Sequence, residues 1–186
     1  MEFEPSGEQP MSPLAVLRAM TMRVERQTSL ASIYREVARQ VRGLTGFDRV
    51  MVYRFDDDGA GEVVAEAANH GLAPFLGLRY PASDIPAQAR ALYERNYLRI
   101  IADVDAPAIP IVPALSPEGA ALDLTMSTLR SVSPIHLEYL RNMGVGASMS
   151  ISIIVDGELW GLIACHHYSP RVLPMSVAAC SSRRTN

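Results

Sequence analysis

Hydrophobic residues recur every three or four positions between residues 29 and 46, with charged residues between them. This spacing predicts an amphipathic helix that packs one face on a core. Ser29 is the expected N-cap, and Gly43 and Gly46 mark the expected end. The apolar side comprises Leu30, Ile33, Val37, Val41 and Leu44, and the solvent side Arg35, Glu36, Arg39 and Arg42. A shorter helix is predicted from Pro13 to about Met22.

Two pairs of β-strands are predicted from their apolar content and from the turns between them. Residues 47–55 and 62–68 form the first pair, joined by the Asp-Asp-Asp-Gly turn at 56–59. Residues 145–155 and 158–167 form the second, and Asp156-Gly157 is a hairpin signal. One strand alternates apolar residues with serines, which gives it one apolar and one polar face. The alternating residues are Ser148, Met149, Ser150, Ile151, Ser152 and Ile153.

The segment 78–90 holds two prolines, one carboxylate and two arginines. Pro81 and Pro86 each fix φ and remove an N–H, so the chain between them is expected to be stiff and not helical. One interpretation is a lead-in to a helix that begins near Pro86 and ends near residue 97, capped by Ser83 or Asp84. The other is the wall of a ligand cavity, since irregular backbone leaves carbonyl groups free to accept hydrogen bonds.

The rest of the pattern completes the order of elements. A short strand is expected at 98–102, and residues 103–128 form a long proline-rich loop. Ser133-Pro134 opens a helix that runs to about Met143, and Gly144 ends it. The order helix, hairpin, helix, strand, loop, helix, hairpin predicts an α+β domain, in which helices pack on an antiparallel sheet.

Composition narrows the class of protein. The 186 residues are 48% hydrophobic, enough for a core, and the net charge of -3 implies no general attraction to nucleic acid or anionic membranes. No apolar run approaches a membrane span, and the acidic start has no signal-peptide pattern. The two cysteines, Cys165 and Cys180, make no disulfide framework, which fits a reducing cytoplasm.

Catalytic and metal chemistry have weak support. The aspartates at 56–58 lack the spacing and closing glutamate of a calcium loop. Neighbouring residues of a strand point to opposite faces, so His166 points away from Cys165 and His167, and two ligands on one face are too few for a closed zinc site. A nucleophilic Cys165 is one reading, and an inert buried thiol is the other.

A cleft is predicted where two segments meet across the sheet. His136 and Tyr139 lie three apart in one helix and share a face, while Ser148, Ser150 and His166 share a face of the second strand pair. These donors suit a flat, mostly apolar ligand that carries carboxylates. The alternative is a capped helix, a satisfied histidine and ordinary strand serines.

Four segments together resemble the chromophore-binding GAF domain of phytochromes, specifically of bacteriophytochromes that use biliverdin. They are residues 47–55, 81–86, 129–144 and 159–167, in the family's order over roughly residues 30–173. The resemblance implies a GAF-type antiparallel β-sheet flanked by helices, with the domain at 29–173, a linker and short helix at 1–28, and a divergent tail at 174–186. It also implies a light-sensing domain that binds a linear tetrapyrrole, photoisomerises, and is not itself an enzyme.

The resemblance further implies the site residues. Asp84, Ile85 and Pro86 are similar to the segment beside the pyrrole nitrogens, and His136 to the histidine that shares a water with them. Arg99 and Arg130 resemble the arginines that hold one propionate. The remaining correspondences are Ser133, Ser148 and Ser150 with His136 at the other propionate, Tyr93 near a propionate, His166 at the terminal ring carbonyl, and Tyr53, Tyr80 and Tyr139 as an aromatic wall.

Three departures from the family pattern modify these expectations. Residues 1–28 contain no cysteine, and Ile135 stands where plant and cyanobacterial relatives carry theirs, so non-covalent binding of biliverdin or a related bilin is expected. We expect this chain to be a fragment that lacks the PAS and PHY domains and a kinase-like output module, because the polar residues 179–186 replace the long helix that the resemblance predicts. We expect a cytoplasmic chain and a possible homodimer; the alternative function is a non-chromophoric GAF module for small-molecule binding or dimerisation.

Overall fold

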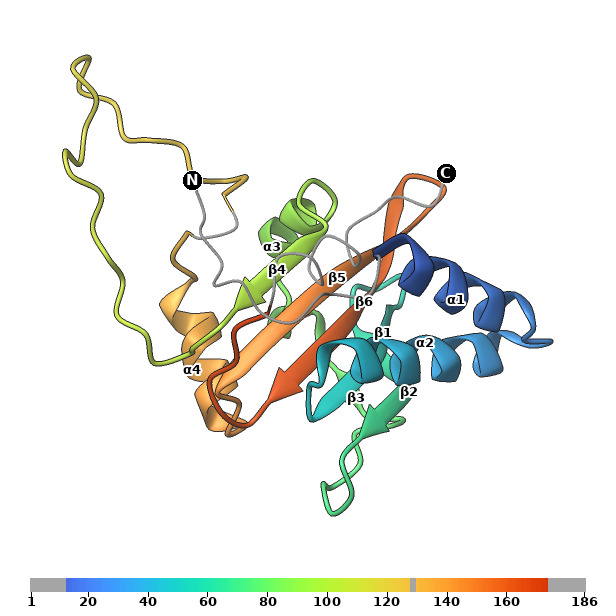
Figure 1. Ribbon diagram of the computed structural model, residues 1–186. Coiled ribbons are helices and arrows are strands. Elements are labelled where there is room, and N and C mark those ends of the chain that lie inside the picture. The colour runs from blue at the N-terminus through green and yellow to red at the C-terminus, as the bar shows by residue number, and fades with distance from the viewer. Residues whose placement is uncertain (1–12, 128–129, 174–186) are drawn as a thin grey trace.

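The computed structural model describes residues 13–127 and 130–173, shown in Figure 1. The helices are α1 Pro13–Glu25, α2 Leu30–Thr45, α3 Ala87–Tyr93 and α4 Pro134–Asn142, with a single 3-10 turn, η1, at Ala82–Asp84. The strands are β1 Arg49–Phe55, β2 Gly61–Ala68, β3 Arg79–Tyr80, β4 Leu98–Ile101, β5 Ala147–Val155 and β6 Glu158–His167. None of the described helices is long and apolar enough to cross a membrane.

The strands form one six-stranded sheet in the order β3-β2-β1-β6-β5-β4, with antiparallel neighbours throughout. Helix α2 covers one face of this sheet, and α3 and α4 lie on the other side (Figure 1). The predicted α+β class with an antiparallel sheet flanked by helices is therefore confirmed.

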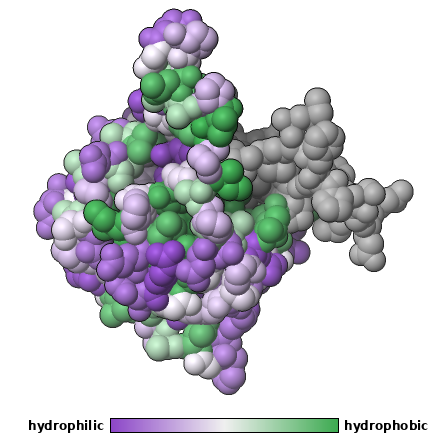
Figure 2. Space-filling model, turned by 90° about the vertical axis from the view of Figure 1, so that its left-hand side faces the viewer, coloured by the Kyte–Doolittle hydropathy of each residue, from purple (hydrophilic) through white to green (hydrophobic). Residues whose placement is uncertain are grey.

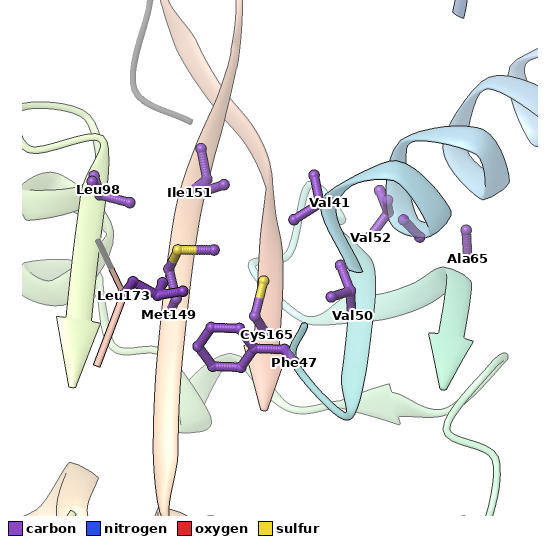
Figure 3. Close-up of a cluster of buried hydrophobic side chains, with 11 residues drawn as sticks. Val41, Phe47, Val50, Val52, Ala65, Leu98, Met149, Ile151, Cys165 and Leu173 are labelled. Carbon is purple, nitrogen blue, oxygen red and sulfur yellow. The ribbon is translucent and has the colours of Figure 1, made fainter. Parts of the chain in front are cut away.

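The main core lies between α2 and the sheet. Figure 3 shows Val50, Met149 and Cys165 on the side of the sheet that Val41 of α2 also faces. Phe47, which is 1% exposed, packs among them. Because side chains alternate along a strand, the residues between these core positions are directed to the opposite face, where the cavity described below lies.

Helix α2 begins and ends largely as predicted. Ser29 and Ser32 form a capping box, with each side chain bonded to the other residue's backbone N–H, and Gly46 ends the helix at φ 67°. The predicted solvent side is wrong at Glu36, which is 9% exposed. The cause is α1, which packs beside α2: Gln40 donates both to Glu36 and to the Met20 carbonyl of α1.

The hairpin signals were also correct. Asp156 and Gly157 have φ of 52° and 87°, as a type I′ turn requires, and they join β5 to β6.

The loop at 103–127 holds no helix or strand, only an isolated bridge between Leu115 and Ala121. Ile109 and Val112 of this loop are exposed apolar residues. Figure 2 shows one face of the molecule, on which hydrophobic groups lie among polar ones.

The segment 78–90 differs from its prediction in three ways. Residues 82–84 form a 3-10 turn, because the Asp84 N–H bonds the free Pro81 carbonyl at 3.1 Å. Neither Ser83 nor Asp84 caps α3: the N-cap is Pro86, without a side-chain bond. Strand β3 was not predicted, and α3 ends at Tyr93 rather than near residue 97, because the chain turns there into β4.

Candidate functional site

A cavity of about 730 Å³ lies between the sheet face opposite α2 and the layer formed by η1, α3 and α4. Its volume falls within the range of small-molecule sites. Every residue that was predicted for the site lines this one cavity. These residues are Tyr53, Tyr80, Asp84, Ile85, Pro86, Tyr93, Arg99, Arg130, Ser133, His136, Tyr139, Ser148, Ser150 and His166.

Polar side chains cross the floor of the cavity on neighbouring strands. Arg99 of β4 is paired in register with Ser150 of β5, and Ser148 of β5 is paired with His166 of β6. Antiparallel pairing directs opposite residues to the same face, so these four side chains face the cavity together. This confirms the expectation that Ser148, Ser150 and His166 share a face.

Two arginines place positive charge in the lining of the cavity. Arg99 and Arg130 both line it, and neither forms an ion pair within the described part of the chain. Burial lowers the pKa of Arg99, and the nearby charge of Arg130 lowers it further. Two close guanidinium groups favour a ligand carboxylate, which each can hold through a planar pair of hydrogen bonds.

One end of the cavity is aromatic. The rings of Tyr53 and Tyr80 lie 6.1 Å apart, and the Tyr139 hydroxyl donates to Asp84 Oδ2 at 3.4 Å. Burial, and then the charge of Asp84, raises the pKa of Tyr53 and of Tyr139 to about 12. Both phenols therefore stay protonated at neutral pH and act as hydrogen-bond donors beside an apolar ligand.

The two histidines of the cavity are neutral at neutral pH. Burial, and then the charge of Arg99, lowers the pKa of His136, whose ring stacks on Tyr139 at 6.5 Å. Burial, followed by Arg49 and His136, lowers the pKa of His166 to about 4. His166 is 8% exposed, and its Nδ1 has no hydrogen-bond partner among the described residues. A neutral imidazole offers one donor and one acceptor to a ligand.

The buried His166 makes stability depend on pH. Its folded pKa of about 4 lies below the ordinary 6.5, so the unfolded chain binds the proton first as pH falls. The contribution of His166 to the free energy of unfolding is fully present above pH 6.5. As the pH falls from 6.5 to 4, this contribution decreases by roughly 3 kcal/mol. We expect H166Q to flatten the slope of unfolding free energy against pH, measured by urea unfolding at a series of pH values. An unaltered slope in H166Q would contradict the assignment.

Further lining residues, most of them apolar, complete the cavity and were not predicted. The sequence pattern could have identified Met51 as a lining residue, because it alternates along β1 with the core residues Val50 and Val52. No periodic pattern identifies Phe75, because it lies in the loop between β2 and β3. The unpredicted lining includes Met51, Val63, Phe75, Ser83, Gln88, Ala89, Leu92, Asn96, Ile101, Val132, Ile135, Leu140, Met143, Leu162 and Ala164.

Cys165 lies outside the cavity. Its side chain is 0% exposed and packs in the core on the α2 face, and burial raises the pKa of its thiol far above the ordinary value. This is the environment of an inert thiol rather than a nucleophile. Within the described residues, no three potential ligand side chains gather as a metal site would require. Cys180 lies outside the described residues.

A family model described as "GAF domain" matches residues 29–181. The chain belongs to the GAF domain family. Within this family it is similar to a bacteriophytochrome of Pseudomonas aeruginosa, with 56% identity over 155 residues, which are 83% of this chain and 21% of that protein. The GAF chain thus spans about a fifth of the length of this curated relative.

Solved structures agree with the GAF fold and with the likeness to phytochromes. The chromophore-binding domain of a bacteriophytochrome from R. palustris superposes with a TM-score of 0.87 at 44% identity, covering 90% of this chain and 56% of that one. The chromophore-binding domain of Stigmatella aurantiaca phytochrome P1 gives 0.86 at 46% identity, covering 96% and 60%. At these identities the likeness extends beyond the fold to the amino-acid sequence.

Proposed function

We propose that this chain is the chromophore-binding GAF domain of a phytochrome-type photoreceptor, that it binds a linear tetrapyrrole, and that it senses red and far-red light. One observation carries the proposal: a single apolar cavity contains the Arg99–Arg130 pair, two neutral histidines and the backbone of Asp84-Ile85-Pro86. A scaffold or dimerisation module needs none of these polar groups in one hollow.

The chain's residues match the chemistry of a bilin, which has a long apolar π-surface, two propionates and four ring nitrogens. Arg99 and Arg130 would hold one propionate, with Tyr93 nearby. The other would lie among hydroxyl and imidazole donors. These donors are Ser133, His136, Ser148 and Ser150. The buried Nδ1 of His166, which has no partner among the described residues, supports a role in bonding a polar group of the ligand.

The segment at 84–86 would serve the ring nitrogens. A backbone carbonyl cannot titrate, so the Asp84 carbonyl is a constant acceptor for their protons, and His136 would share a water with them. A bound bilin supplies absorption of visible light and isomerisation about a methine bridge. The chain's part is to restrict that motion, through the wall of Tyr53, Tyr80 and Tyr139.

We further propose that the pigment is biliverdin and that it is held without a covalent bond. Cys165 packs on the other face of the sheet, and the cavity residue at the position of the plant and cyanobacterial attachment is Ile135. On a denaturing gel, biliverdin should separate from the chain and leave no coloured protein band. Pigment that stays with the denatured protein would refute non-covalent binding.

The proposal also includes further domains in a longer receptor. We propose that residues 29–173 are the GAF unit of a longer cytoplasmic receptor, with PAS, PHY and kinase-like output modules, and that any kinase activity resides in the output module. A homodimer of such receptors would carry the signal. Size-exclusion chromatography with light scattering, in darkness and under red light, measures whether the GAF chain itself associates.

Mixing the purified chain with biliverdin tests the proposed function. We expect a sharp far-red absorption band that changes reversibly under red illumination. A spectrum identical to that of free biliverdin, in a chain that is folded by circular dichroism, would contradict it. A folded, bilin-blind chain that binds another small molecule or dimerises would support the non-chromophoric alternative.

Asp84 offers a prediction within this function. Its carbonyl would bind the ring nitrogens, while its carboxylate accepts from Tyr139. We therefore expect D84A to bind biliverdin within about threefold of the wild-type affinity, since the loss of one side-chain hydrogen bond costs little, but to photoconvert poorly. The D57A variant, altered at an exposed turn residue, is the control. An equal loss of uptake and photoconversion in D84A would contradict this division between backbone and side chain.

A further inference from the structure

Three backbone features converge on Tyr53, the aromatic residue of β1 that lines the cavity. On one side, the pairing of β1 with β2 shifts between Val52 and Tyr53, whose partners are Ala65 and Val63, so the ladder skips Val64. On the other side, Gly161 of β6 lies so close that a Cβ there would overlap the Tyr53 carbonyl oxygen. Bulges of this kind redirect side chains beside functional sites.

The third feature is Gly61, the first residue of β2. Gly61 pairs with Phe55 and is therefore the diagonal neighbour of Tyr53 on the same face of the sheet. The Tyr53 ring lies directly over it: a Cβ at residue 61 would overlap Cζ, Cε1 and Oη of the phenol. The φ of Gly61 is not in the left-handed region, so the backbone conformation is compatible with alanine. The steric conflict of an alanine side chain would be with the Tyr53 ring.

We propose that Gly61 is a positioning residue for Tyr53: its missing side chain is the space in which the phenol lies, and it sets how far that ring reaches into the cavity. The consequence for pigment binding rests on the proposed function. The consequence for the position of the Tyr53 ring does not.

The surroundings of the ring determine where it would move. Tyr53 is 7% exposed, and the Phe55 ring meets it edge-on at 5.3 Å. Met51 and Val63 pack in the same cluster. The remaining side of the ring faces the cavity, which Tyr80 also lines. A methyl group at residue 61 would thus push the phenol into the end of the cavity that Asp84 and Tyr139 also line, and would shorten the space for a ligand.

A double-mutant cycle on biliverdin affinity tests the proposal. We expect G61A to raise the dissociation constant by at least about fivefold, the lower range of an overpacking cost. The effect should persist in a Y53F background, because Cζ and Cε1 remain, and disappear in a Y53A background, because the ring is gone. G43A, at a glycine of α2 with open space around it, should bind as the wild type does. A G61A effect of equal size in the Y53A background, or no effect in any background, would overturn the proposal.

A measurement without pigment separates this inference from the proposed function. In protein carrying ¹³C-labelled tyrosine rings, the Tyr53 signal is identified by its loss in Y53F. G61A should shift this signal and leave that of Tyr34, on the other face, in place. Unmoved Tyr53 signals would overturn the inference even if the pigment binds, and shifted signals support it even if the wild type binds no bilin. If G61A does not fold, recovery of folding in Y53A/G61A supports the proposal and continued failure overturns it.

Discussion

Replacing Arg49 with alanine is expected to lower the free energy of unfolding by about 3–5 kcal/mol, as is typical when one partner of a buried ion pair is removed. Arg49 is 1% exposed and forms an ion pair with Glu66, whose side chain is 7% exposed. Arg49 also donates to the Ala73 carbonyl at 2.7 Å and lies 3.8 Å from the Phe75 ring centroid. Without it, the Glu66 carboxylate would stay buried without its cation.

The same substitution should loosen a wall of the cavity. Glu66 Oε2 accepts the backbone N–H groups of Phe75 and Leu76 at 3.0 and 3.1 Å, and Phe75 lines the cavity. Arg49 and Glu66 therefore hold the loop between β2 and β3 against the sheet.

The matched control for R49A is R54A. Arg54 lies on the same strand and pairs with Glu62 of β2 at 3.2 Å, but these side chains are 39% and 29% exposed. We expect R54A to cost less than about 1 kcal/mol, since solvent screens such pairs. Urea unfolding of both variants measures the difference, and an R49A cost as small as that of R54A would show that the buried pair does not stabilise the fold.

Removing the anion-binding charge should have the largest effect on the ligand. We expect R130A to weaken biliverdin binding by roughly 10- to 100-fold, which corresponds to the loss of a hydrogen bond to a charged group. Arg130 lines the cavity, and its charge lies close enough to lower the pKa of Arg99. The double variant R99A/R130A should bind more weakly still, because the carboxylate would then lose both guanidinium partners.

Two controls make this prediction specific. R95A removes an exposed arginine four residues before Arg99 and should leave the affinity unchanged. Biliverdin dimethyl ester carries no free propionate, so R130A and the wild type should bind this ester about equally. If R130A weakens the binding of the ester as much as the binding of biliverdin itself, Arg130 acts through packing and not through a propionate.

The elements that were predicted correctly are those with local signals. Helix α2 is marked by its spacing and by the capping residue Ser29, and the β5–β6 hairpin by Asp156-Gly157, whose positive φ angles few other residue pairs tolerate. The alternation at 148–153 likewise predicted which residues would face the cavity. These signals depend on neighbouring residues only, so they can be read along the chain.

What was not predicted depends on contacts distant in sequence. The burial of Glu36 follows from the packing of α1 on α2, and β3 exists because two residues reach the edge of β2. Phe75 reaches the cavity through Arg49 and Glu66, and no periodicity marks a residue placed by such a tether. The pair Arg99 and Arg130 was suggested by resemblance to the phytochromes, since neither residue shows a local pattern of its own.

The most direct test of the cavity as the pigment site is an absorption titration of the chain with biliverdin, beside the A164W variant. Ala164 lies on β6 in register with Ser150 and Met51 on the cavity floor, and an indole there would project into the space that the ligand needs. We predict that the wild type develops a far-red band that saturates at one biliverdin per chain, and that folded A164W develops none. A band of equal strength in both proteins, or a folded wild type without a band, would contradict the account.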